Sequence, residues 1–473
     1  MGTINSAFSL ISGALDADQA ALNVVANNVA NANTPGYTEE TPNWQENQPI
    51  TINGVSYGAG VTETGATSVR DRVLTERLDQ QQQLASASGS RLTALNTLQA
   101  LFTPDSGSTS ATAGDIGSDL TSFFSSFSSL EANPTNNALR QQVLSTATTL
   151  AGDVSNAAAS LNSQRSALDQ EASGVTSQVN ALTGAIAQLN RQIQSTSPNA
   201  DAGTLEDQRQ QDLSQLSQLI GINQITTENN GLSITTTSGQ LLVSEGSSFQ
   251  LTTGTVNGVT DFFLGGTDIT SQLTGGGGEL GGYLTARDQD IPSALGSLDQ
   301  LAYNVSTQVN TLNNAGTDLD GVTGTVANPL YIFNQPTVVA GSAANMSVVM
   351  TDPNQIAAAG LGQGMGDNSN ATAMANLANQ SIVNGQIPTD YYSSFVSTLG
   401  STVSSVQTEN TAQNASVTQL QTQNNALSSV NLNDEASSMT TLERSYQAAS
   451  QVFTMLNTIM ASALNLGDQT AVS

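Results

Sequence analysis

Apolar residues at the start of the chain recur at alternating intervals of three and four positions. The pattern runs from Ile4 to Val29 and is interrupted by one charged position, Asp18. This spacing places the apolar side chains on one face of an amphipathic helix and is typical of a heptad seam. The helix is predicted to end before Pro35-Gly36, because proline disfavours helical backbone in the residue before it and Pro-Gly suits a type II turn. The seam consists of Ile4, Phe8, Ile11, Leu15, Leu22, Val25 and Val29.

The end of the chain repeats this pattern. Apolar positions from Met439 to Ala463 alternate in the same way, and Val452, Met455 and Ile459 widen the stripe. Gly467 fits a helix C-cap just beyond it. We therefore predict a second amphipathic helix that meets the first one or other partners. The seam residues expected to make these contacts are Leu442, Tyr446, Phe453, Leu456 and Met460.

The middle of the chain holds further helices. The longest heptad run covers residues 154–193 and predicts a rod of roughly 60 Å at 1.5 Å per residue. A weaker run covers 399–427, with polar seam positions that cost stability but help to set the register. Helical patterns also cover about 70–100, 116–131, 204–220 and 288–314.

Strand-like patterns are confined to two regions. Residues 222–273 contain short runs rich in Thr, Ile, Val and Phe, separated by Asn-Gly turns, and a second patch lies near 330–350. The predicted fold is mainly α with a smaller β part. The expected domains are a terminal one formed by 1–65 with 432–473, and a central one over 66–431 that is helical in 70–220, 288–314 and 370–431 and β-rich in 222–275 and 322–352.

The energetics of the terminal helices predict that they need partners. Burying such a stripe stabilises by about 12–24 kcal/mol, at ~1.5–3 kcal/mol per side chain. Ordering ~30 residues costs about 30–60 kcal/mol, and isolated helices are marginal in water. We therefore expect roughly residues 1–60 and 435–473 to be disordered or fraying in the monomer and to fold among neighbours.

Composition excludes much chemistry. The chain has neither His nor Cys, and its ten basic residues are all Arg. A His base, a Cys nucleophile, Cys/His metal sites, haem ligation and lysine chemistry are therefore excluded. The net charge of −28 opposes nucleic acids and anionic membranes as partners. We predict no enzyme, cofactor or metal site, and no cleaved export signal, because the N-terminus lacks a basic region and an unbroken apolar run.

Two weaker chemical signals are set aside. Asp318-Leu-Asp320-Gly321 has the start of a calcium loop but lacks the later ligands, so a turn is expected. A secreted carboxylate-based hydrolase or binding module is the remote alternative function. It would need two acids about 5–10 Å apart in a cleft within 222–350. Trp44 is expected to pack under the extended segment that follows the first helix.

Four asparagines lie at the end of the first helix. Asn is a mediocre helix former that favours turns and caps. The cluster therefore either marks a fraying helix end before the turn, or supplies amides that hydrogen-bond neighbouring subunits. Both interpretations stay open. The four residues are Asn27, Asn28, Asn31 and Asn33.

Three segments carry a resemblance to a known family. Val24-Val-Ala-Asn-Asn-Val-Ala-Asn-Ala-Asn-Thr-Pro-Gly-Tyr37 closely resembles the N-terminal signature of bacterial flagellar rod, hook and hook-associated proteins. Ser429-Val-Asn-Leu-Asn-Asp-Glu-Ala436 resembles their C-terminal signature. Gly278-Glu-Leu-Gly-Gly-Tyr-Leu-Thr-Ala-Arg-Asp288 is similar to a segment particular to the hook-associated protein 1, or FlgK, family.

The resemblance implies a structural function. Members of that family form a ring between hook and filament, in a helical lattice of head-to-tail copies. The implied partners are further copies, the hook protein, hook-associated protein 3 and an export chaperone on the C-terminal helix, about residues 430–470. The implied location is the extracellular hook–filament junction of the flagellum, reached by type III export. A hook or distal rod protein is the alternative.

The resemblance also implies the domains. The terminal helices would form the inner tube domain, D0, and the rest a helical bundle with β elements, D1. Longer members carry an outer β domain, D2, between the two β patches. Here only about 20–25 residues separate Gly321 from Met346, so D2 is expected to be absent or vestigial.

Overall fold

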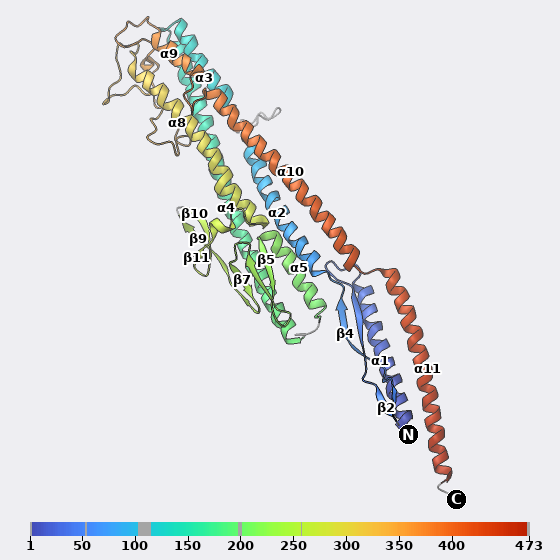
Figure 1. Cartoon of the computed structure of the whole chain (residues 1–473). Coiled ribbons are helices and arrows are strands. Elements are labelled where there is room, and N and C mark those ends of the chain that lie inside the picture. The colour runs from blue at the N-terminus through green and yellow to red at the C-terminus, as the bar shows by residue number, and fades with distance from the viewer. Residues whose placement is uncertain (1, 53, 103–114, 197–200, 257, 471–473) are drawn as a thin grey trace.

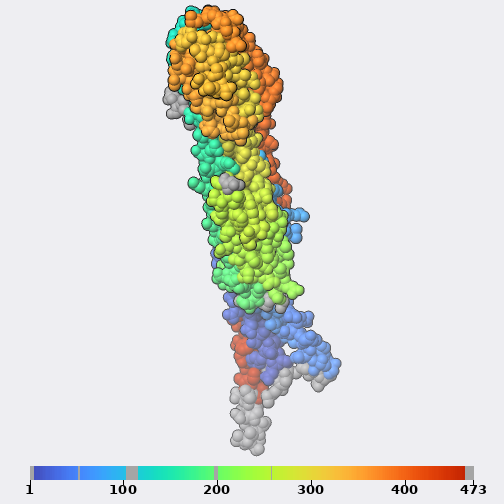
Figure 2. All heavy atoms as spheres, turned by 90° about the vertical axis from the view of Figure 1, so that its left-hand side faces the viewer, coloured from blue at the N-terminus to red at the C-terminus, as the bar shows by residue number. Residues whose placement is uncertain are grey.

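The computed structural model describes residues 2–52, 54–102, 115–196, 201–256 and 258–470. The molecule is a long rod with both chain termini at one end (Figure 1). A space-filling view shows the rod as one continuous body, with the terminal helices as its narrow end (Figure 2). Helices supply most of the described elements and short strands the rest, so the predicted fold class is confirmed.

Five helices build the central body. Their main core is apolar and gathers the aromatic rings of Phe123, Phe124 and Phe127. The longest helix, α4, has 60 residues and is about 90 Å long, so it exceeds the predicted rod at both ends. None of the described helices combines the length and apolarity that crossing a bilayer demands. The five are α2 (Arg72–Ala100), α3 (Ile116–Ala132), α4 (Asn137–Thr196), α8 (Ile291–Ala315) and α10 (Pro388–Ser428).

Two small sheets pack beside α4, where strands were predicted. The first is antiparallel in the order β5-β6-β7-β8 and the second in the order β11-β10-β9. They share an apolar core with α4, α5 and α7. The elements are α5 (Thr204–Leu219), β5 (Ile222–Thr226), β6 (Leu232–Thr236), β7 (Leu241–Ser244), β8 (Ser247–Ser248), β9 (Leu251–Val256), β10 (Val259–Leu264), β11 (Thr267–Asp268), α6 (Thr270–Leu273) and α7 (Gly278–Thr285).

A buried arginine ties these sheets to the helices. Arg287, in a π-helical turn before α8, is 1% exposed and forms ion pairs with Asp169 of α4 and with Asp288. It also donates to the Thr260 carbonyl of β10 over 2.7 Å and lies over the Phe262 ring. Arg287 thus connects its own π-helical turn to α4 and to β10.

Close packing explains the glycines of the segment 278–288, which carries the family resemblance. Gly278 has φ +74°, and a Cβ there would overlap the backbone of Ile220. A Cβ on Gly282 would overlap Ser90 Oγ and the Ala87 carbonyl of α2. Glycine therefore lets α7 cross α2 with backbones nearly in contact.

The prediction that 322–352 is β-rich is wrong. The described chain there forms only isolated bridges, such as Phe333 with Val348. Its strand-like apolar residues are anchors that insert into the helical core. Side-chain amides of α8 replace a neighbouring strand: Asn310 bonds both the N–H and the carbonyl of Phe333, and Asn313 donates to the Leu330 carbonyl over 2.7 Å. The region ends at α9 (Ser369–Asn376), and 377–387 separates α9 from α10.

The terminal end consists of two helices and a hairpin arm. Helices α1 (Gly2–Asn31) and α11 (Leu432–Thr470) pack against each other, and the arm follows α1. In the arm, β1 (Glu40–Glu46) pairs with β4 (Val61–Ser68), and β2 (Ile50–Ile52) pairs with β3 (Val55–Tyr57). The expectation that Trp44 packs under this segment is wrong, because its side chain is 51% exposed.

Candidate assembly site at the terminal helices

The two terminal helices pack against each other, and one pair of residues from the predicted seams meets there. Phe8 of α1 and Phe453 of α11 form an edge-to-face pair with ring centroids 5.3 Å apart. At the other end of α1, Asn28 contacts Glu435, so the two helices run antiparallel. The most deeply buried apolar residues of α1 are small, Ala17, Ala21 and Val25. The larger apolar side chains of its predicted seam, such as Ile11, Leu15 and Leu22, are only half-buried, so α1 buries little apolar area.

The predicted contact residues divide between this seam and the surface. The half-buried ones are Phe8, Ile11, Leu15, Leu22, Leu442, Phe453, Leu456 and Met460. Val29 and Tyr446 are more exposed, at 39% and 38%. The predicted contact of Ile4 falls on a side chain outside the described part of the structure.

Asn28 organises the end of α1. Its amide nitrogen donates to the Glu40 carbonyl over 2.8 Å and to Glu435 Oε1 over 2.9 Å. Its oxygen accepts from the Tyr37 hydroxyl over 2.8 Å and from the Glu40 N–H over 3.0 Å. At 1% exposed, it satisfies all of its hydrogen-bonding capacity within its own chain. Asn28 is therefore a latch between α1, the arm and α11.

The other asparagines are local or exposed. Asn31 donates to the carbonyl and side chain of Asn27, and Thr34 donates to Asn31. Asn33 is exposed. The predicted turn follows: Gly36 has φ +83° and the Tyr37 N–H donates to the Thr34 carbonyl over 3.2 Å. This turn brings Tyr37 back onto Asn28.

The electrostatics of the latch are dominated by carboxylates. Burial raises the pKa of Glu435, and nearby Glu39 and Asp434 raise it further, while the hydrogen bond from Asn28 lowers it. Burial and the charges of Glu40 and Asp207 raise the pKa of Tyr37. The tyrosine therefore keeps its proton near neutral pH and remains a donor to Asn28.

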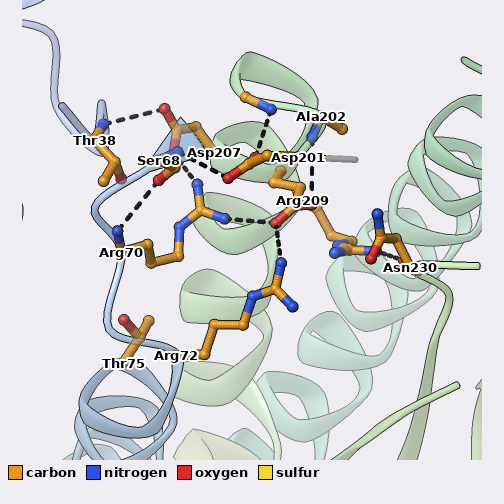
Figure 3. A network of polar contacts seen from close by, with 12 residues as sticks. Thr38, Ser68, Arg70, Arg72, Thr75, Asp201, Ala202, Asp207, Arg209 and Asn230 are labelled. Carbon is orange, nitrogen blue, oxygen red and sulfur yellow. Dashed lines mark hydrogen bonds and ion pairs between the residues drawn. The ribbon is translucent and has the colours of Figure 1, made fainter. Parts of the chain in front are cut away.

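A buried ion network joins the arm to the rod (Figure 3). Arg70, directly after β4, pairs with Glu206 Oε2 at 2.9 Å and with Asp207, both at the start of α5. Arg72 shares Glu206 over 3.0 Å. The N–H of Thr38 donates to Asp207 over 3.1 Å. No local pattern in the sequence indicates this network, because its acids and arginines lie more than 130 positions apart.

A second apolar row on α11 remains largely exposed among the residues that the structure describes. Val452, Met455 and Ile459 are 40%, 59% and 53% exposed, while the adjacent row faces α1. At helical spacing the row extends back through Ala448 to Arg444, which makes no ion pair with a described residue. The row is an exposed apolar surface of the kind that marks contact sites.

Comparisons with known proteins agree with this arrangement. A model of the flagellar hook-associated protein FlgK helical domain matches residues 106–326. A model of the flagella basal body rod protein matches residues 11–38, which include Asn28 and the Pro35-Gly36 turn.

Relatives that match over nearly the whole chain share the name flagellar hook-associated protein 1. Flagellar hook-associated protein 1 of Escherichia coli strain K12 is 26% identical over 98% of this chain and 99% of its own length. The protein of that name from Salmonella typhimurium is also 26% identical, over 96% and 98%, and that of Bacillus subtilis is 25% identical, over 96% of each.

A solved structure has a similar fold. The flagellar hook junction protein FlgK from Burkholderia pseudomallei superposes with a TM-score of 0.63 at 18% identity, over 73% of this chain and 99% of that one. The helical-domain model and the relatives that match over nearly the whole chain name the same flagellar protein. The asparagine-rich motif at the end of α1 is explained by the hydrogen bonds of Asn28. The chain belongs to the flagellar hook-associated protein 1 family.

Proposed function

We propose that this chain is a structural subunit of the bacterial flagellum at the junction between hook and filament. The observation that carries the proposal is the open row of α11, by which we mean the exposed side chains of Val452, Met455 and Ile459. This row lies beside the face of α11 that packs on α1. A helix with one paired face and one open apolar face can receive a second copy. Repeated contacts of this kind are head-to-tail and follow a helical lattice. The relatives are structural flagellar proteins, and the proposal assigns the chain no reaction.

The terminal helices are proposed to become ordered on assembly. Many α11 side chains are exposed in the single chain, and the α1 side of the seam buries mainly Ala and Val. The intramolecular seam alone therefore offsets little of the entropy cost of ordering two helices. Frayed ends also suit export through a narrow channel without a cleaved signal, because ordering waits for neighbours.

The proposed partners follow from the family. We propose contacts with further copies, with hook protein on one side and with hook-associated protein 3 on the other, and chaperone binding to α11 before export. The exposed apolar row of α11 supports the last proposal, because a chaperone that covered it would prevent premature assembly. The proposed location is the extracellular hook–filament junction.

The proposed domains are D0 from the terminal helices and D1 from the rod. A separate outer domain D2 is proposed to be absent or vestigial. In support, the alignment to the Escherichia coli protein spans 554 positions although this chain has 473 residues, so that relative has residues that this chain lacks. The described segment between α8 and α9 also forms no strand ladder.

Charge substitution on the open row tests the proposal. Cells whose only copy carries Met455→Asp should make hooks without attached filaments, while the purified variant keeps the thermal unfolding of its rod. Thr454→Asp adds the same charge on another face of the same helix and should leave filaments attached. Normal filaments in the Met455→Asp cells would rule out the open row as the assembly surface.

A further inference from the structure

A groove with exposed aliphatic walls lies where the rod meets the terminal helices. The start of α2 and the end of α10 line it, through Asp71, Val73, Leu74, Arg77, Gln423, Ala426 and Leu427. The Asp71 carboxylate is already engaged as the N-cap of α2, where it accepts from the Val73 and Leu74 N–H groups. Val73 is 62% exposed and Leu427 is 58% exposed. Two large aliphatic side chains that share a groove and remain in water mark a contact surface.

The groove also carries the positive charge of Arg77, which has no described partner. The chain has ten arginines against 38 acids, and the ion pairs described above occupy Arg70, Arg72 and Arg287. Arg77 is exposed and forms neither an ion pair nor a hydrogen bond with any described residue. The groove therefore favours a partner that is apolar with an acid at its edge.

The tip of the hairpin arm has this chemistry. Ile50 pairs with Tyr57 in the β2–β3 register, and Val55 lies on the same face because it is two residues from Tyr57. These three side chains are 39%, 51% and 53% exposed, in the order Ile50, Tyr57, Val55. Glu46, at the adjoining end of β1, is exposed, and its side chain contacts no described residue by ion pair or hydrogen bond.

The tip lies far from the groove of its own chain. Figure 1 places β2 beside the N-terminus, whereas α2 and α10 meet the terminal end at the opposite end of α1. Helix α1 has 30 residues and is about 45 Å long. Strands β1 and β4 pack on α1, and the arm projects sideways at the narrow end of the rod (Figure 2). Only another molecule can bring such a tip to this groove.

We propose that the hairpin tip of one copy docks into the junction groove of a second copy. Ile50, Val55 and Tyr57 cover Val73 and Leu427, and Glu46 pairs with Arg77. The inference rests on the proposed function, because copies displaced along a tube place the arm of one beside the junction of the next. It adds a specific contact between the arm and the rod to the packing of the terminal helices.

Disulfide trapping tests the contact directly, since the chain has no cysteine of its own. Two versions, Val55→Cys and Leu427→Cys, are made in the same cells, and isolated hooks are oxidised. A covalent dimer should appear only when both versions are present. The pair Val326→Cys and Leu427→Cys is the control, because Val326 is fully exposed but lies in the segment after α8. Monomer alone, or a cross-link from Leu427→Cys to another protein, would overturn the proposal.

A charge exchange gives an independent readout. Arg77→Glu should lower the fraction of hooks that carry filaments roughly tenfold, because a weak contact is multiplied around a ring. Adding Glu46→Arg should restore it, and Arg191→Glu is the charge-matched control. Equal filament counts in all variants would overturn the proposal. If the unaltered chain were missing from isolated hooks, the proposed function itself would fail.

Discussion

The amide of Asn28 donates to Glu435 Oε1 over 2.9 Å and so joins two residues 407 positions apart. The contact is buried, and the second carboxylate oxygen of Glu435 has no hydrogen-bond partner among the described residues. Glu435 therefore depends on Asn28 for the compensation of a buried charge. This pair explains why an asparagine-rich motif ends the first helix of a protein whose last helix begins with acids.

Replacing Asn28 should weaken the junction in the assembled flagellum. Asn28→Ala leaves Glu435, Tyr37 and Glu40 without a buried partner, and each such loss costs about 1–3 kcal/mol. We expect fewer filaments to remain on cells after controlled shear. Asn33→Ala removes an exposed amide and should behave like the parent chain. Equal filament retention in the two variants would contradict the latch.

The ion network should be essential to the rod. Arg70→Gln removes the cation that holds Glu206 and Asp207, and breaking a buried ion pair costs about 3–5 kcal/mol. The midpoint of urea unfolding should fall accordingly. Arg77→Gln removes an exposed arginine that pairs with no described residue and should change the midpoint little. An unchanged midpoint for Arg70→Gln would show that the network is dispensable.

The close crossing of α7 and α2 should require a glycine at position 282. Gly282→Ala places a methyl group against Ser90 and the Ala87 carbonyl, so the helices must separate. We expect the free energy of unfolding to drop by about 1–3 kcal/mol, as in other overpacked cores. Gly296→Ala in α8 meets nothing within 4 Å and should be neutral or should stabilise by up to about 1 kcal/mol. If both variants unfold alike, the close crossing is not required.

A buried acid predicts a pH dependence. Asp79 of α2 is 1% exposed and accepts from Gln210 and Gln224, and burial raises its pKa to about 6 from an ordinary value near 4. Because the folded state binds this proton more tightly, the contribution to stability is full below about pH 4 and is lost as pH rises through 6. The total is about 3 kcal/mol at 1.36 kcal/mol per pKa unit.

The variant Asp79→Asn isolates this effect. Its free energy of unfolding should lose the part of the pH dependence between 4 and 6 that the parent chain shows. Unfolding curves at a series of pH values, for both proteins, measure the difference. Parallel pH profiles would mean that Asp79 titrates normally in the folded chain.

Local periodicity predicted the helices well, because a stripe at steps of three and four is intrinsic to a segment. The region 222–273 also contains the predicted strands, and the predicted Asn230-Gly231 turn separates β5 from β6. The error at 322–352 arose because apolar runs there are anchored by Asn310 and Asn313, whose amides bond the backbone in place of a second strand. Such a substitution depends on tertiary contact and leaves no local pattern.

The assembly site was predictable in part. The terminal stripes identified Phe8 and Phe453, which do meet. The role of Asn28 was open, because spacing cannot tell whether an amide bonds its own chain or another. The Arg70 network could not be predicted, since its partners come together only when α5 lies against the arm.

The most direct test of the central claim is to image cells from which the gene has been deleted. If the chain is a structural subunit of the hook–filament junction, the deleted cells should display hooks without filaments and shed filament subunits into the medium, and the unaltered gene should restore filaments. Cells that keep attached filaments and swim after the deletion would contradict the account.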